Sequence, residues 1–188
     1  MRSIAKMWFR LWRAVPDLVA DRRALAAVEF AFILPVMMVM LFGTVEFSSA
    51  IAIDRKITLM ARTLSDLTSQ ATTVSSTDLT NFFAASTGIM TPYPTATLNT
   101  TITQIYVDSS LKPTVKWSQG SAPISDPVTV PTSLAVADTY LIYSQVSYNY
   151  VPTVGYVLAK GGITMSDSAF TRPRQSKCVN FPDSSHGC

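Results

Sequence analysis

Side chains that could do chemistry are sparse in this 188-residue chain. Its one histidine, His186, lies in the same terminal tail as the two cysteines, Cys178 and Cys188. The three could be drawn as metal ligands, but they lack the spacing of known zinc motifs. A disulfide between the cysteines is the favoured interpretation, and a pair of free thiols is the alternative. We therefore expect neither a metal nor a cofactor.

The remaining polar side chains form no catalytic pattern. Catalysis would need a nucleophile beside a base, a pair of acids or a metal cluster, and outside the apolar segment the acidic residues are scattered singly. An aromatic surface is conceivable, although packing within a sheet explains the same residues. The tyrosines concerned are Tyr140, Tyr143, Tyr148, Tyr150 and Tyr156. The sequence predicts no enzyme and no small-molecule substrate.

Glu29 is the one charge in an apolar run over residues 24–45. These 22 residues would span roughly 33 Å as a helix, enough to cross a hydrocarbon core of about 30 Å. A buried helix of a soluble protein is rarely apolar on every face over such a length. Glu29 should either have a partner or extend its carboxylate to the interface. Pro35 in the same run predicts a helix kink, because it removes a backbone N–H.

The charges around this run predict its orientation. Residues 1–24 carry six basic and two acidic side chains, a net of +4, whereas the rest of the chain has nine basic and ten acidic ones. Basic flanks stay in the cytoplasm, and the apolar run is too long for an ordinary signal peptide. We expect a cytoplasmic leader at 1–24, a transmembrane helix at 25–47 and a periplasmic domain at 48–188, in a bacterial inner membrane. The nearly neutral domain argues against nucleic-acid binding.

The leader itself allows two interpretations. Apolar residues recur at helical spacing between arginines and lysines, which is typical of an amphipathic helix on a membrane surface. A disordered basic tail is the alternative.

The sequence contains two Glu-Phe pairs, one near the start of the apolar run and one just after its end. The first lies in RRALAAVEFAFILP at 22–35 and the second in LFGTVEF at 41–47. With these segments the chain resembles the TadE-like family, minor pseudopilins of tight-adherence (type IVc) pilus systems. Segments 148–152 and 172–174 are similar to the closing strands of that family. The resemblance implies a structural or assembly component of such a pilus. Its implied partners are other pilins or pseudopilins, pilus-assembly proteins and a prepilin-type peptidase.

The resemblance also implies a processing site. The peptidase would cut between Ala24 and Leu25, which makes Glu29 the fifth residue and Phe30 the sixth. The family usually has glycine before the cut, where this chain has alanine. The new amine of Leu25 and the carboxylate of Glu29 would attract strongly in a low-dielectric setting, so we assign Glu29, with Glu46 of the second pair, to assembly. The alternative function is a single-pass, membrane-anchored periplasmic binding module that uses an aromatic strand face.

The elements that position these residues follow from hydrophobic periodicity. We expect an α+β fold, in which the transmembrane helix continues into a pilin-like domain with a small antiparallel sheet. An apolar stripe continues the helix, and it favours packing on the domain's own sheet over a coiled-coil partnership. The stripe consists of Ile53, Ile57, Met60, Leu64 and Leu67.

The rest of the domain is predicted as one short helix and four strands. The helix is expected at 77–87, capped by Ser76 or Thr77 and ended by Gly88. The strands are expected at 97–107, 114–118, 140–151 and 163–171. The second should alternate around Val115 and Trp117. The third should have one face made of Tyr140, Ile142, Ser144, Val146, Tyr148 and Tyr150. Prolines 123, 127 and 131 predict a loop. The tail with the two cysteines is expected to support little other structure, so its bridge should add less than the 2–3 kcal/mol of the loop-entropy estimate.

Overall fold

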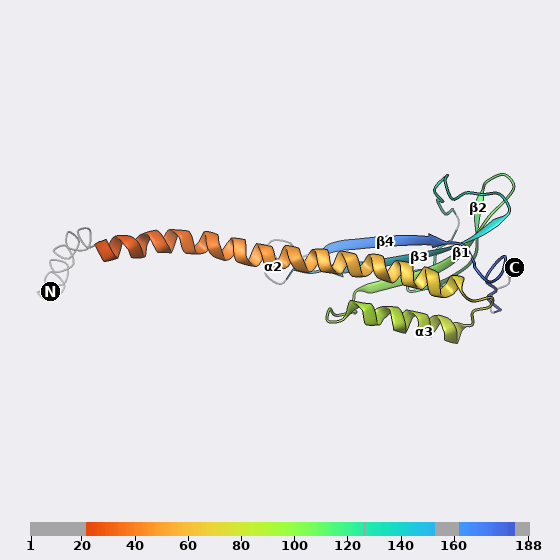
Figure 1. The fold of residues 1–188 in the computed structure, drawn as a ribbon, viewed down its shortest axis with the longest axis horizontal. Coiled ribbons are helices and arrows are strands. Elements are labelled where there is room, and N and C mark those ends of the chain that lie inside the picture. The colour runs from red at the N-terminus through yellow and green to blue at the C-terminus, as the bar shows by residue number, and fades with distance from the viewer. Residues whose placement is uncertain (1–21, 126, 153–161, 183–188) are drawn as a thin grey trace, which may run out of the picture. The chain divides into compact units, whose positions relative to one another are not determined.

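The computed structural model describes residues 22–125, 127–152 and 162–182 (Figure 1). The chain divides into two units, Met1–Phe47 and Ser48–Cys188, each considered separately below. The leader, Tyr156, His186 and Cys188 lie outside the described residues, so the predictions about them stay predictions.

A single helix, α2, covers Arg22–Ser69 and passes through Pro35 without interruption. It is the one helix in the described ranges that is long and apolar enough to cross a membrane. Between Leu25 and Phe47 its large apolar side chains are exposed, for example Phe32 at 76% and Val39 at 73%. Such a surface is stable in lipid or against other apolar helices, but not in water. The kink at Pro35 stays a prediction.

Four antiparallel strands form one sheet with the order β2-β1-β3-β4. They cover Leu98–Val107 (β1), Pro113–Gly120 (β2), Thr139–Tyr150 (β3) and Ile163–Thr171 (β4). Each lies close to its predicted range, and the bounds of β4 are those predicted. Together with α2, and with a short helix described below, the sheet confirms the α+β fold class.

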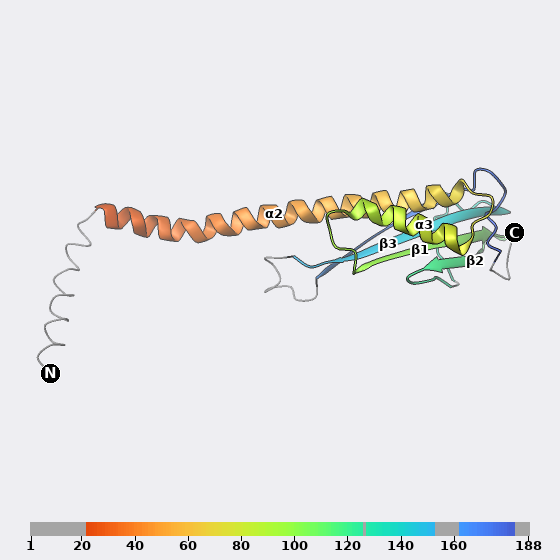
Figure 2. The same ribbon diagram turned by 90° about the horizontal axis from the view of Figure 1, so that it is seen from below.

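The part of α2 that belongs to the domain packs on this sheet (Figure 2). Ile53, Ile57, Met60 and Leu64 are fully buried in the main core, whereas Leu67 is half-buried. On β3 the alternate residues of the predicted apolar face, from Ile142 to Tyr150, are buried in the same core. The apolar stripe of α2 is therefore used for packing on the domain's own sheet, as the sequence favoured.

Strand β2 corrects the predicted alternation around Val115 and Trp117. Gln104 of β1 pairs with Trp117, but Ile105 pairs with Val115, so Lys116 is an extra residue in a bulge. A bulge reverses the side-chain alternation locally. Trp117 consequently joins the core under the helices, and Val115 packs against a second core on the opposite face of the sheet. The predicted proline-rich loop contributes Val128 to that second core.

The short helix α3 covers Ser76–Thr87, and its N-cap is Ser75, not Ser76 or Thr77. The physical reason is a capping box with Asp78. The Ser75 Oγ accepts a bond from the Asp78 N–H at 3.2 Å, and the Asp78 carboxylate accepts one from the Ser75 N–H at 3.0 Å. Gly88 is the C-cap of α3, so the helix ends where it was predicted to end, and a 3₁₀ turn, η1, follows over Gly88–Met90.

The C-terminal tail is part of the core, which makes the expectation of a loosely attached tail wrong. Val179 and Phe181 are buried at 0% and 3% exposure in the main core. The Val179 N–H donates to Gln104 Oε1 at 2.7 Å, and the Val179 carbonyl accepts from Trp117 Nε1 at 3.0 Å. The backbone N–H of Asn180 donates to the Thr72 carbonyl, and its backbone carbonyl accepts from the Val74 N–H. Thr72 and Val74 lie in the connection between α2 and α3. These bonds tie the end of the chain to the sheet and to the helices.

Candidate functional site: the assembly helix and a charged groove

The residues of the predicted processing site lie in the first turns of α2, and Ala24 and Leu25 are both helical. Leu25 and Phe30 are each 60% exposed, and Glu29 is exposed as well. Positions four apart lie on the same face of a helix, separated by about one turn. A new amine on Leu25 would therefore lie on the same helix face as the carboxylate of Glu29.

Glu29 and Glu46 occupy opposite ends of the apolar part of α2. They are seventeen positions apart, which corresponds to about 26 Å along a helix axis. A hydrocarbon core is about 30 Å thick, so a helix that crosses it would place both carboxylates near its two edges. The same spacing turns them about 100° apart around the helix, so they do not share one face. Glu29 and Glu46 therefore point to different sides of α2.

Of the two cysteines, the structure describes Cys178. Its side chain is buried at 7% exposure, directly before the core residue Val179. The disulfide to Cys188 stays a prediction. In the described ranges no group of three or more histidine, cysteine or acidic side chains is placed to hold a metal ion.

The predicted aromatic face is largely used for packing. Tyr148 and Tyr150 are buried in the main core, and Tyr143 contacts Phe170 with ring centroids 4.6 Å apart. Tyr140 stacks on Tyr106 at 4.8 Å, near one end of the sheet. The Tyr106 hydroxyl donates to the Asp138 carboxylate at 2.8 Å, and this hydrogen bond raises the pKa of Tyr106.

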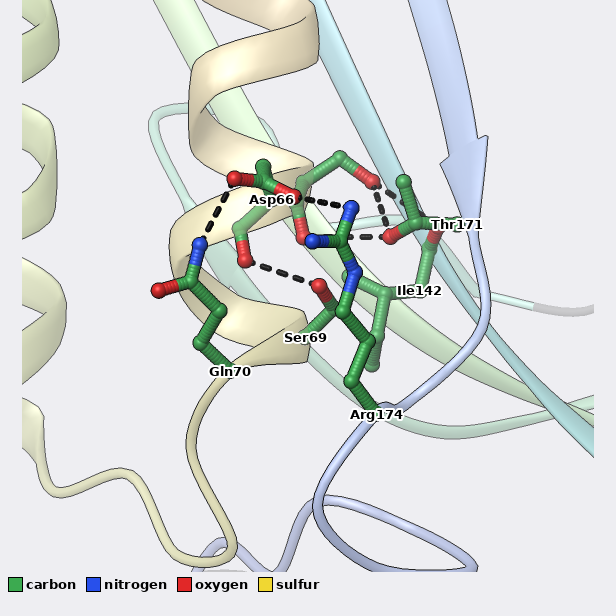
Figure 3. A network of polar contacts seen from close by, with 7 residues as sticks. Asp66, Ser69, Gln70, Ile142, Thr171 and Arg174 are labelled. Carbon is green, nitrogen blue, oxygen red and sulfur yellow. Dashed lines mark hydrogen bonds and ion pairs between the residues drawn. The ribbon is translucent and has the colours of Figure 1, made fainter.

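A polar network at the end of α2 was not predicted from the sequence (Figure 3). Asp66 forms an ion pair with Arg174 at 2.5 Å, and its other carboxylate oxygen accepts a bond from Gln70 at 2.7 Å. At the preceding residue of the helix, the Ser65 and Thr171 hydroxyls are 2.7 Å apart. The network therefore joins α2 to the end of β4 and to the segment that follows it.

Next to this network, a groove of about 580 Å³ runs between α2 and β4. One wall consists of helix residues and the other of the last residues of β4, with Arg174 at the end. The lining residues are Arg62, Thr63, Asp66, Leu67, Ser168, Ala169, Phe170, Thr171 and Arg174. The groove thus contains two guanidinium groups and one carboxylate. A surface with this charge balance favours an anionic group over a cationic one.

A second unpredicted contact attaches α2 to the turn after α3. The Lys56 ammonium donates to the carbonyl oxygens of Ile89 at 2.6 Å and Thr91 at 2.9 Å, and lies 6.0 Å from the ring centre of Tyr93. Cations commonly bind the unsatisfied carbonyls at helix ends. Neither this contact nor the Asp66–Arg174 pair has a sequence signature, because the partners are far apart in the chain.

With this geometry established, comparison with known proteins gives one match. Residues 25–64 match the model of the TadE-like protein family. This helix is TadE-like. The match begins at the predicted new N-terminus, covers the exposed apolar part of α2 and ends within the part that packs on the sheet. It confirms the resemblance seen in the sequence, although the similar segments at 148–152 and 172–174 lie outside it. Searches of curated proteins and of solved structures each gave no significant match.

The TadE-like family is associated with tight-adherence pilus systems and is a family of structural pilus components. Together with the exposed apolar half of α2, the match indicates membrane association.

Proposed function

We propose that this protein is a minor pseudopilin-like structural component of a tight-adherence (type IVc) pilus system. The TadE-like helix anchors it in the bacterial inner membrane with the leader in the cytoplasm. The domain at 48–188 lies in the periplasm or in the pilus. A prepilin-type peptidase cuts between Ala24 and Leu25. The mature protein then assembles with other pilins or pseudopilins through the membrane part of α2.

The observation that carries this proposal is that the two parts of one helix, α2, have different environments. The TadE-like match covers both an apolar stretch that no described part of the protein buries and a stretch whose apolar stripe is buried in the domain core. A helix used only as an anchor does not require a family pattern that extends into the folded domain. A subunit that assembles through the membrane and presents a domain outside it requires both.

N-terminal sequencing of the protein purified from membranes tests the proposal. We expect the mature chain to begin at Leu25, whereas a simple anchored protein keeps its leader. Ala24→Gly restores the residue usual in the family and should be processed at least as completely. Ala24→Arg is the matched variant that should block the cut. A native chain that retains residues 1–24 in piliated cells would contradict the proposed processing.

A reporter tests the topology separately. Alkaline phosphatase fused after Thr171 should be active, since the basic leader is expected to keep the N-terminus inside. Activity of only a cytoplasmic reporter at the same position would contradict the proposed orientation.

The alternative, an anchored periplasmic binding module, rests on the aromatic strand face. Because Tyr148 and Tyr150 are buried in the core, that face offers little free aromatic surface. The buried tyrosines therefore favour the pilus component.

A further inference from the structure

Strand β4 is an edge strand of the sheet, and its pairing is regular along its whole length. Within the described ranges it pairs with β3 alone, over nine consecutive residue pairs without a bulge. Natural edge strands usually carry a proline, a lysine, a bulge or a cover that prevents another chain from adding to them. Asp167 is the one charged residue of β4, and its carboxylate accepts a bond from the Thr58 hydroxyl of α2 at 2.5 Å. The Asp167 side chain points toward the helix and also accepts the Ser168 N–H at 2.7 Å, so it limits strand addition at this position. No other residue of β4 carries a charge.

The opposite edge of the sheet, β2, is protected in the ways that β4 is not. It begins with Pro113, contains the bulge at Lys116 and ends at Gly120. The segment after it also folds back along the strand, since the Ile124 N–H donates to the Ser118 hydroxyl at 2.8 Å. The β2 edge is thus protected by several features, whereas β4 is regular and carries one inward-pointing charge, Asp167. This difference makes β4 the edge at which strand addition is favoured.

The charged groove runs directly beside this open edge. A chain that adds to the second half of β4 would lie along Ser168–Thr171, and its side chains would reach the groove. Within the groove Asp66 is already paired with Arg174, whereas Arg62 has no carboxylate partner among the described residues. Arg62 is exposed, and its guanidinium can hold a carboxylate in a bidentate contact.

We propose that β4 and the charged groove form a docking site for an extended, acidic segment of another protein. The segment adds to the sheet as a fifth strand beside β4, and one of its carboxylates binds Arg62. The main-chain hydrogen bonds supply sequence-independent affinity, and the groove selects for an acidic side chain. This site lies within the domain at 48–188, so it does not depend on the proposed processing or on assembly in the membrane.

Peptide binding to the full-length protein in detergent micelles tests this site. The probe is a fluorescent nine-residue peptide of alternating threonine and valine with a central glutamate, and binding is followed by anisotropy. A second peptide has lysine in the central position. A third keeps the glutamate but carries N-methyl groups on alternate residues, which removes the donors needed for strand addition. Amide hydrogen exchange of residues 163–171 reports whether β4 is the strand that pairs.

Two charge reversals accompany the peptides. Arg62→Glu changes the groove, and Arg55→Glu is the matched control, because Arg55 is an exposed residue of the same helix outside the groove. We expect the glutamate peptide to protect β4 amides and to bind about tenfold more weakly to Arg62→Glu, a loss of about 1.4 kcal/mol. Arg55→Glu should bind it as the native protein does. The lysine peptide should prefer Arg62→Glu, and the N-methylated peptide should not bind.

Four results would overturn the proposal. Absence of binding up to millimolar peptide excludes an open edge, and equal binding of the N-methylated peptide excludes strand addition. Equal affinities of the native protein and Arg62→Glu for the glutamate peptide exclude the charge selection. Dimerisation of the protein through β4 without peptide would assign the edge to a second copy of this chain. Each result leaves the location of the mature N-terminus untouched.

Discussion

Replacement of Phe181 by alanine tests whether the C-terminal tail is a structural part of the domain. Phe181 is 3% exposed and lies against Trp117, with ring centroids 5.6 Å apart. Phe181 packs in the main core, although the sequence predicted that the tail to which it belongs supports little other structure. Because the substitution leaves the backbone bonds of Val179 and Asn180 in place, it isolates the contribution of the buried ring.

The magnitude follows from the burial of the side chain. Removal of a fully buried phenylalanine ring costs about 3–5 kcal/mol, depending on how far the site collapses around the cavity. The tail is near the chain end and can move inward more easily than a strand, so we expect a value near the lower limit, about 3 kcal/mol. For a domain of this size that corresponds to a fall in Tm of roughly 6–12 °C.

Urea unfolding of the full-length protein in mild detergent, followed by tryptophan fluorescence, measures this loss. Val136→Ala is the control, since Val136 is 43% exposed and should change stability by less than about 0.5 kcal/mol. A loss below about 1 kcal/mol for Phe181→Ala would refute the docking of the tail.

Replacement of Cys178 and Cys188 by serine should cost at most about 2–3 kcal/mol, and the tail should stay docked, since Phe181 and Val179 still pack in the core.

Four further substitutions address other contacts. Lys56→Met removes the ammonium that binds two carbonyls after α3 and should cost about 1–3 kcal/mol in urea unfolding; unchanged stability would show that the contact is not formed. Ser75→Ala should cost about 1 kcal/mol. The pKa of Asp78 is lowered, first by the hydrogen bond from the Ser75 side chain and then by the one from the Ser75 N–H. The ionised Asp78 carboxylate therefore stabilises the folded domain above its ordinary pKa, and this stabilisation is lost as the pH falls through the lowered pKa. Acid titration of unfolding should show this loss, and Asp78→Asn should remove it. Glu29→Gln should leave insertion and processing intact but abolish piliation if the carboxylate pairs with the new amine; normal pili would remove that role.

Patterns of short range predicted most of the secondary structure. Twenty-two nearly uncharged residues can hardly be anything but a helix in an apolar medium, and the alternation in β3 follows directly from the two-residue period of a strand. The TadE-like pattern is also local, since it lies in one continuous helix. These features depend on neighbouring residues and are therefore visible in the sequence.

Features that depend on distant residues were decided by the tertiary structure. The bulge at Lys116 places Val115 and Trp117 on opposite faces of the sheet, because the pairing of β2 with Gln104 and Ile105 of β1 skips Lys116. The N-cap moved to Ser75 because its side chain and that of Asp78 satisfy each other's backbone N–H groups.

The tail and the groove show the same distinction most clearly. Residues 178–181 show neither helical nor strand periodicity. Trp117 of β2 and Gln104 of β1 nevertheless form hydrogen bonds with Val179 in this segment. Arg174 meets Asp66 only because β4 ends beside the last turns of α2. The amino-acid sequence thus determined the long apolar helix, its TadE-like pattern and the strands, since these arise from local periodicity. Which edge of the sheet stays open, and which charges gather beside it, was decided by the packing of segments that are far apart in the chain.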